Sequence, residues 1–188
     1  MSEIPEAPET VEQGDGTDVK HILDTSNLLS HEEWEELESR AEDISNRQHC
    51  GIYFAMVDDY TEYRDGSVFE VTYHNNQLGV GDGRDGVIVL LSMEERDYAM
   101  FVYGEYAEYA FDEYGQEKLE EKFLGFFEYD DWYGGISHYL DACDEFLTKA
   151  DEGDPVRPSY WENILLVTGL SCLVSGAVCF WLLRSMKT

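Results

Sequence analysis

The chain has 188 residues and a formal net charge of −29 at neutral pH, from 41 acidic and 12 basic side chains. A charge this negative argues against nucleic acids and anionic lipid headgroups as partners, and it favours cations and basic proteins. The alternative, that the charge only keeps an exposed domain soluble, stays open.

Residues 1–20 are rich in Pro, Glu, Gly and Asp and contain almost no large apolar side chain. Such a segment cannot bury enough surface to order itself, so we predict a disordered acidic linker. The pattern then changes at "NLLSHEEWEELESRAEDI", where Ser30 and Glu33 form a capping box and apolar residues recur on one helical face. This stretch predicts the first helix.

An almost continuous apolar run, "CGIYFAMV" at residues 50–57, predicts a buried strand that ends at Asp58 and Asp59. Residues 60–78 fit either a helix or a strand, and we favour a helix. "GVIVLLS" and "YAMFVY" then flank the polar "MEERD", which predicts an antiparallel hairpin.

Two amphipathic helices follow the hairpin, one in "QEKLEEKFLGFF" and one at about residues 132–149. Helices interleaved with a few strands over about 130 residues predict a single α/β domain at residues 21–150, with a small central sheet between helices.

A transmembrane helix is predicted from Asn163 to Leu183, because no residue there is charged and the helix can cross about 30 Å of hydrocarbon. Residues 151–162 form a linker that contains two prolines. Arg184 and Lys187 follow the span, so the positive-inside rule places residues 184–188 in the cytoplasm and the acidic domain outside it. We therefore expect a single-pass protein of the cell membrane. A tail-anchored protein with a cytoplasmic domain is the alternative.

Export of the N-terminal side requires a signal peptide, yet residues 1–30 contain no apolar stretch of that kind. We therefore expect the sequence to be a mature or trimmed form. Cys50 and Cys143 are the two cysteines that precede the span. A disulfide between them stays open, because nothing in their spacing decides it.

The stretch "GVGDGRDG" at residues 79–86 has glycines at the spacing of a dinucleotide-binding loop. It leads into a strand rather than a helix, and Asp82 and Asp85 would repel a phosphate, so the sequence argues against a nucleotide. A metal-binding loop and a plain turn remain as alternatives.

Three stretches occur in order along the chain, "ILDTSNLLS", "GDGRDGVIVLLSMEERDYAMFVYG" and "KFLGFFEYDDWYGGI". Through them the chain resembles the TPM-domain family over about residues 20–150, in the form of its membrane-anchored members from Firmicutes. Asp24 falls on the family's opening aspartate, Asp85–Gly86 on its Asp-Gly, Arg96 on its hairpin arginine and Asp131 on its late acidic loop. The segment "VYGEYAEYAFDEYG" departs from the family, which often has a glycine-rich stretch there.

Membership implies an α/β fold, binding of calcium or a similar metal, and acid phosphatase activity in some members, whereas many others are scaffolds or assembly factors. Asp24, Asp85 and Asp131 come from separate loops, and we expect them to meet with Asp82 around a divalent cation, with Ca²⁺ as the best match for oxygen ligands. The alternative is that Asp24 and Asp131 cap helices and that Asp85–Gly86 makes a turn.

We expect the domain to act as a divalent-metal-binding interaction or assembly module with a basic or membrane protein as partner. The alternative is a metal-dependent acid phosphatase in which Arg96 contacts the phosphate of a phosphomonoester. No nucleophile motif supports this alternative, and Arg96 can instead pair with Glu94, Asp97 or another hairpin neighbour.

Overall fold

The computed structural model describes residues 20–58, 78–81 and 84–158. The helices and strands in this part are, in chain order, β1 (Ile22–Asp24), α1 (His31–Gln48), β2 (Gly51–Val57), β3 (Gly86–Ser92), β4 (Asp97–Tyr103), α3 (Glu105–Ala110), α4 (Glu113–Phe127) and α5 (Trp132–Asp151). The prediction for residues 60–78 falls almost entirely outside the described residues, as does the span predicted at 163–183. No helix within the described ranges is long and apolar enough to cross a membrane.

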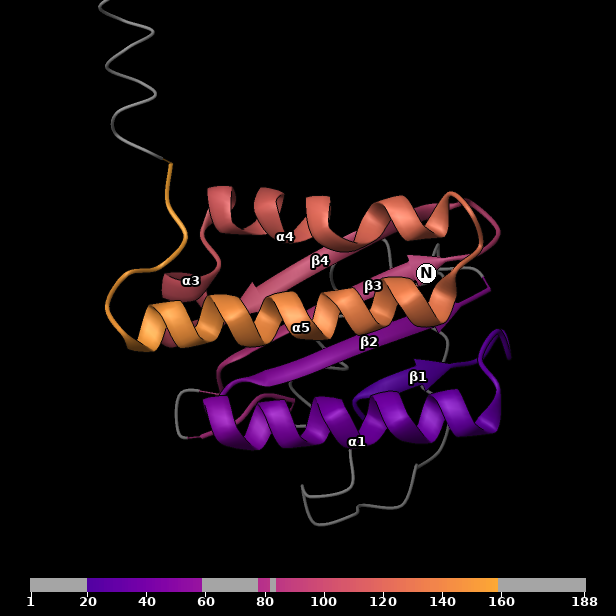
Figure 1. Cartoon of the computed structure of the whole chain (residues 1–188), viewed down its shortest axis with the longest axis horizontal. Helices are drawn as coiled ribbons and strands as arrows, with labels where there is room; N and C mark the ends of the chain where they lie inside the picture. The colour runs from indigo at the N-terminus through magenta and orange to yellow at the C-terminus, as the bar shows by residue number, and fades with distance from the viewer. Residues whose placement is uncertain (1–19, 59–77, 82–83, 159–188) are drawn as a thin grey trace, which may run out of the picture. The chain divides into compact units, whose positions relative to one another are not determined.

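The four strands form one sheet in the order β1-β2-β3-β4, in which β1, β2 and β3 are parallel and β4 is antiparallel to β3 (Figure 1). Asp24 lies opposite Met56, which lies opposite Leu91. The ends of the three parallel strands therefore meet at one side of the sheet, which we call the carboxyl edge. Their starts, with Gly51 opposite Gly86, define the amino edge.

The core lies between the sheet and a layer formed by α1, α4 and α5 (Figure 1). Phe54 in the middle of β2 contacts the rings of Phe123, Phe127 and Tyr139, with ring centroids 5.4–6.3 Å apart. The buried Tyr139 hydroxyl donates to the backbone carbonyl of Tyr53 at 3.1 Å, which anchors α5 over β2. Among the described residues, the three long helices form one layer over one face of the sheet (Figure 1).

The predicted starts and ends of the local elements agree well with the structure. Ser30 caps α1, accepting from the amide of Glu33 while the Glu33 carboxylate accepts from the amide of Ser30. All seven residues of β2 and all seven of β3 are buried. The prediction of a single α/β domain is confirmed. The short helix α3 was not predicted, because "EYAEYA" shows no apolar stripe.

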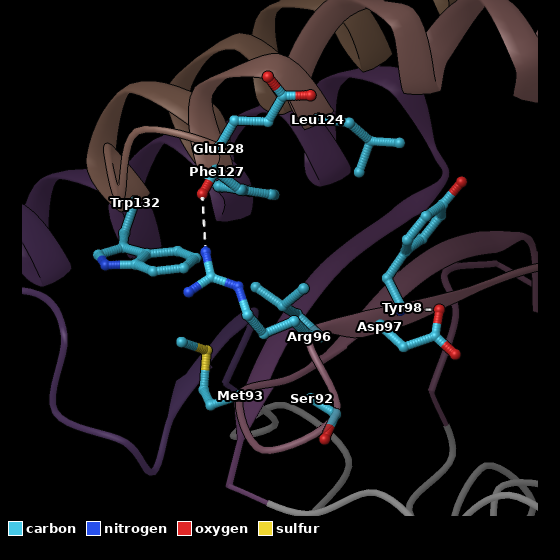
Figure 2. A pocket seen from close by; sticks show the side chains of 10 residues that line it. Ser92, Met93, Arg96, Asp97, Tyr98, Leu124, Phe127, Glu128 and Trp132 are labelled. Carbon is cyan, nitrogen blue, oxygen red and sulfur yellow. Dashed lines mark hydrogen bonds between the residues drawn. The ribbon is translucent and has the colours of Figure 1, made fainter.

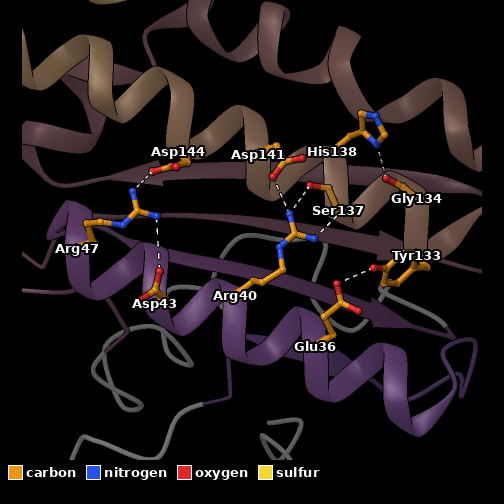
Figure 3. A network of polar contacts seen from close by, with 10 residues as sticks. All are labelled: Glu36, Arg40, Asp43, Arg47, Tyr133, Gly134, Ser137, His138, Asp141 and Asp144. Carbon is orange, nitrogen blue, oxygen red and sulfur yellow. Dashed lines mark hydrogen bonds and ion pairs between the residues drawn. The ribbon is translucent and has the colours of Figure 1, made fainter.

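Polar side chains join α1 to α5 along the outside of the helical layer (Figure 3). The pairs are Arg40 with Asp141 at 2.6 Å, Arg47 with Asp144 at 2.8 Å and Tyr133 with Glu36 at 2.8 Å. Both arginines of α1 are thus paired with carboxylates. They hold two helices together and form no basic patch for an anionic partner.

Candidate functional site

Polar groups from three parallel strands gather at the carboxyl edge. Asp24 ends β1, Asp58 follows β2, and Ser92 ends β3. The hydroxyl of Ser26 donates to the Asp58 carboxylate at 2.7 Å, and the amide of Glu94 donates to the Asp58 carbonyl at 2.8 Å. The loop after β1, the end of β2 and the β3–β4 hairpin are therefore tied together at Asp58.

Within the described part of the chain, only one of the two carboxylate oxygens of Asp24 accepts a hydrogen bond. Its Oδ2 accepts from the amide of Leu29 at 2.9 Å, which fixes the loop that leads into α1. Its Oδ1 is buried and has no hydrogen-bond partner among the described residues. A buried carboxylate oxygen without a donor is costly unless a cation or a proton compensates it. Asp24 therefore fits one ligand position of a cation site.

Asp131 lies in the α4–α5 loop, and this loop contacts the β3–β4 hairpin at the carboxyl edge. Arg96 of the hairpin contacts the neighbouring Asp130 at 3.4 Å, and Asp130 has a left-handed backbone with φ 56°. Asp131 itself caps α5, because its Oδ1 accepts from the amide of Gly134 at 2.9 Å. The structure thus brings Asp24, Arg96 and Asp131 to one edge of the sheet.

Asp85 lies at the opposite edge. It precedes β3, and its Oδ1 accepts from the amides of Tyr106 at 2.8 Å and Ala107 at 3.1 Å, in the first turn of α3. Seven residues of β3 at about 3.3 Å each separate the two edges by roughly 20 Å. The structure therefore does not bring Asp85 together with Asp24 and Asp131 as the sequence analysis expected. Asp82 lies outside the described residues.

The described part of the glycine-rich stretch forms a tight turn at the amino edge. Gly79 and Gly81 have φ values of 98° and 75°, which favour glycine, and Val80 pairs with Asp85 in an isolated antiparallel bridge. A Cβ at Gly79 would lie 2.4 Å from the Arg84 carbonyl oxygen. The glycines are thus needed for the turn that starts β3.

Asp58 was not predicted as a site residue. It directly follows a buried strand, and this position in the sequence could have placed it at the carboxyl edge. Among the residues that the structure describes, no three acidic, histidine or cysteine side chains lie close enough together to hold a metal ion. A cation at this edge would have to combine one or two carboxylates with backbone or water oxygens, as Ca²⁺ sites can.

A small cavity of about 190 Å³ opens beside this edge, between the β3–β4 hairpin and the α4–α5 loop (Figure 2). Arg96 lies in its lining with a left-handed backbone at φ 49°. Its Nη2 contacts the Phe127 carbonyl oxygen at 3.5 Å and Asp130 Oδ1 at 3.4 Å. The carboxylate partner of Arg96 is therefore Asp130 of the α4–α5 loop rather than a neighbour in the hairpin.

Solved structures share this fold at low sequence identity. The N-terminal domain of a protein from P. gingivalis matches with a TM-score of 0.58 and 12% identity, over 74% of this chain and 88% of that chain. The BA42 protein from the psychrophilic bacterium Bizionia argentinensis matches with a TM-score of 0.54 and 12% identity, over 67% and 86% of the two chains.

No curated protein matches the sequence significantly. The family model for the TPM domain matches residues 22–146, from the first residue of β1 to the last third of α5. This range includes every strand of the sheet and every residue that the structure places at the carboxyl edge. The chain therefore belongs to the TPM domain family.

Proposed function

We propose that this protein is a single-pass membrane protein whose TPM domain lies outside the cytoplasm and acts as a divalent-cation-dependent interaction module. Ca²⁺ is the proposed cation and the carboxyl edge its site. The observation that supports this most directly is the buried Oδ1 of Asp24, which accepts no hydrogen bond from the part of the chain that the structure describes. The uncharged segment at 163–183, followed by Arg184 and Lys187, supports the membrane location.

The hydrogen bonds around Asp24 and Asp58 indicate how a cation would act. The Leu29 amide holds Oδ2 of Asp24, so the carboxylate is oriented before any cation arrives and Oδ1 stays available. Asp58 already links the loop after β1 to the hairpin. Neutralising Asp24 and its neighbours would rigidify this edge, and a partner protein would then meet an ordered surface. In a chain with a charge of −29, the cation would also reduce local repulsion.

The second candidate is the metal-dependent acid phosphatase, which one observation favours. The Arg96 side chain is 64% exposed at the edge where the cation is proposed, so it can reach a phosphate there. Hydrolysis of a chromogenic phosphomonoester by the full-length chain, with and without divalent metal, separates the two candidates. Metal-dependent turnover that Arg96→Lys reduces would establish the phosphatase, and its absence leaves the interaction module.

Melting of the full-length chain in detergent tests the cation site. We expect Ca²⁺ to raise Tm by several degrees, because a ligand at about 100 times its Kd stabilises the folded state by about 2.7 kcal/mol. Asp24→Asn should abolish the rise, since the amide keeps an acceptor for Leu29 but removes the charge. Asp154→Asn, an exposed control with the same charge change, should keep it.

Asp85→Asn provides a second comparison, because Asp85 lies at the other edge. This variant should melt at a lower temperature than the parent, since it weakens the cap of α3, yet it should respond to Ca²⁺ as the parent does. A Tm that ignores both Ca²⁺ and Mg²⁺, or an equal response in Asp24→Asn, would contradict the proposed site.

A further inference from the structure

The cavity beside Arg96 has mostly apolar walls. Met93, Leu124, Phe127 and Trp132 line it, and the ring of Trp132 stacks on Phe127 with centroids 5.4 Å apart. Its volume of about 190 Å³ lies below the roughly 300 Å³ at which sites for drug-sized ligands begin. The cavity can therefore hold one large side chain but not a nucleotide. A pocket that takes one buried anchor is the usual centre of a protein interface.

Arg96 adds a cationic group with only long hydrogen-bond contacts to these apolar walls. Figure 2 shows its guanidinium group pointing toward the Phe127 carbonyl, with Trp132 and Met93 on either side. Both of its contacts are made by Nη2 and both are long, at 3.4 and 3.5 Å. Within the described part of the chain, Nη1 donates to no other group. Nη1 and Nη2 together form a guanidinium edge that matches a carboxylate through two parallel hydrogen bonds when Nη2 gives up its long contact with Asp130.

We propose that this cavity binds the carboxyl-terminal residue of a partner polypeptide. The large apolar side chain of that residue fills the cavity, and its free α-carboxylate replaces Asp130 and accepts from Nη1 and Nη2 of Arg96. A terminal residue carries both groups on one Cα, which suits a guanidinium that itself borders the apolar cavity. Inorganic phosphate suits the site less, because it has no apolar group to fill the cavity.

The acidic surroundings do not prevent this binding. The lining also contains Asp97 and Glu128, but Figure 2 shows both carboxylates turned away from the guanidinium group. The Arg96–Asp130 contact is exposed on both sides, with side chains 64% and 67% accessible, so it is weak and can be displaced. Repulsion from the rest of the acidic chain is screened beyond about 8 Å at physiological ionic strength.

The proposal names the class of partner for the interaction role proposed above, but it does not depend on the cation. The test therefore uses the full-length chain in detergent with EDTA present. The probes are N-acetyl-Gly-Gly-Phe and N-acetyl-Gly-Gly-Leu with a free carboxylate, and the same peptides as C-terminal amides. Binding is followed by NMR at the methyl group of Met93 and the indole N–H of Trp132, both of which line the cavity.

We expect at least one acid peptide to shift both resonances with a saturable dependence on its concentration. Its amide should bind roughly tenfold more weakly or worse, because a charge-assisted pair of hydrogen bonds is lost. Arg96→Gln should weaken the acid to the level of the amide, and Arg96→Lys should fall between, since a lysine keeps the charge but not the fork. Arg47→Gln, the matched control on α1, should bind as the parent does.

Four outcomes would overturn the proposal. Acid and amide could bind equally, Arg96→Gln could bind like the parent, or inorganic phosphate at the same concentration could shift the two resonances as strongly as the peptide. The fourth is that neither peptide, nor a pool with randomised terminal residues, shifts them at all. Asp24→Asn should retain peptide binding in EDTA, so a failure of the cation site and a failure of the peptide site give different results.

Discussion

Asp24 and Asp85 are chemically identical side chains beside parallel strands, but their hydrogen bonds differ. Oδ1 of Asp85 accepts from two amides in the first turn of α3, so its charge is compensated by the protein itself. Oδ1 of Asp24 is buried, and no donor within residues 20–58, 78–81 and 84–158 reaches it. Asp85 is therefore a helix cap, whereas Asp24 keeps one carboxylate oxygen for the proposed cation.

Cys50 and Cys143 are both buried and both free, so the disulfide that the sequence left open is not formed. Burial, with a smaller contribution from Asp85, raises the pKa of Cys50 to about 12. Burial also raises the pKa of Cys143 well above its usual value. Both thiols therefore stay protonated in the folded domain over the whole physiological range, and both should be poor nucleophiles.

These raised pKa values predict how stability depends on alkaline pH. The unfolded chain releases a thiol proton near pH 9, whereas folded Cys50 keeps its proton until about pH 12. The folded state is thus favoured in full below pH 9, and this contribution is lost as pH rises toward 12. Denaturant unfolding at several pH values should show a decline of about 1.4 kcal/mol per pH unit for each such thiol.

Cys50→Ala provides the control. It should reduce the loss of unfolding free energy per pH unit by the contribution of one thiol. Alkylation followed by mass spectrometry of the proteolytic fragments that contain Cys50 and Cys143 gives an independent check. Neither cysteine should react at pH 8 in the folded protein, and both should react in denaturant. Rapid modification of either thiol under native conditions would show that it is not buried.

At the scale of elements, the packing of α4 against α5 positions the cavity and the loop that contains Asp130. Gly135 in the first turns of α5 allows the Phe127 ring of α4 to approach, since a Cβ at Gly135 would lie 2.1 Å from that ring. Phe127 and Trp132 also line the cavity. A change at the helix contact should therefore affect the cavity as well as stability.

Gly135→Ala should destabilise the domain by about 1–3 kcal/mol, because the added methyl group overpacks the contact with Phe127. Gly125→Ala is the matched control within α4, where a Cβ would meet nothing within 4 Å. It should instead stabilise the domain by about 0.5–1 kcal/mol, since alanine is the better helix former. Urea unfolding of the two variants measures both effects. Equal changes would show that Phe127 moves aside without cost.

For the whole molecule, the proposed location assigns the acidic domain and the short basic end to opposite sides of the membrane. Protease added to intact cells should therefore degrade residues 20–150 while a tag placed after Thr188 survives. Positive-inside topology predicts this result, because Arg184 and Lys187 stay in the cytoplasm. Degradation of the domain only after lysis would instead support the tail-anchored alternative.

The sequence by itself determined the local elements and the family. The capping box at Ser30 and Glu33 predicted the start of α1, and the apolar runs predicted β2 and β3. These signals could be read because each depends on neighbours within one or two turns of helix or one strand length. The motifs around Asp24, Arg96 and Asp131 gave the TPM resemblance for the same reason, and the family model confirms it.

Only the tertiary structure decided which of these residues share a site. Asp24 ends one parallel strand and Asp58 follows the next, so both lie at the carboxyl edge, whereas Asp85 precedes a strand parallel to theirs and lies at the amino edge. Strand order and direction arise from contacts between residues far apart in the chain, and no local pattern encodes them. The pairing of Arg96 with Asp130, and the cavity beside it, likewise required the α4–α5 loop to fold back onto the hairpin, 34 residues away.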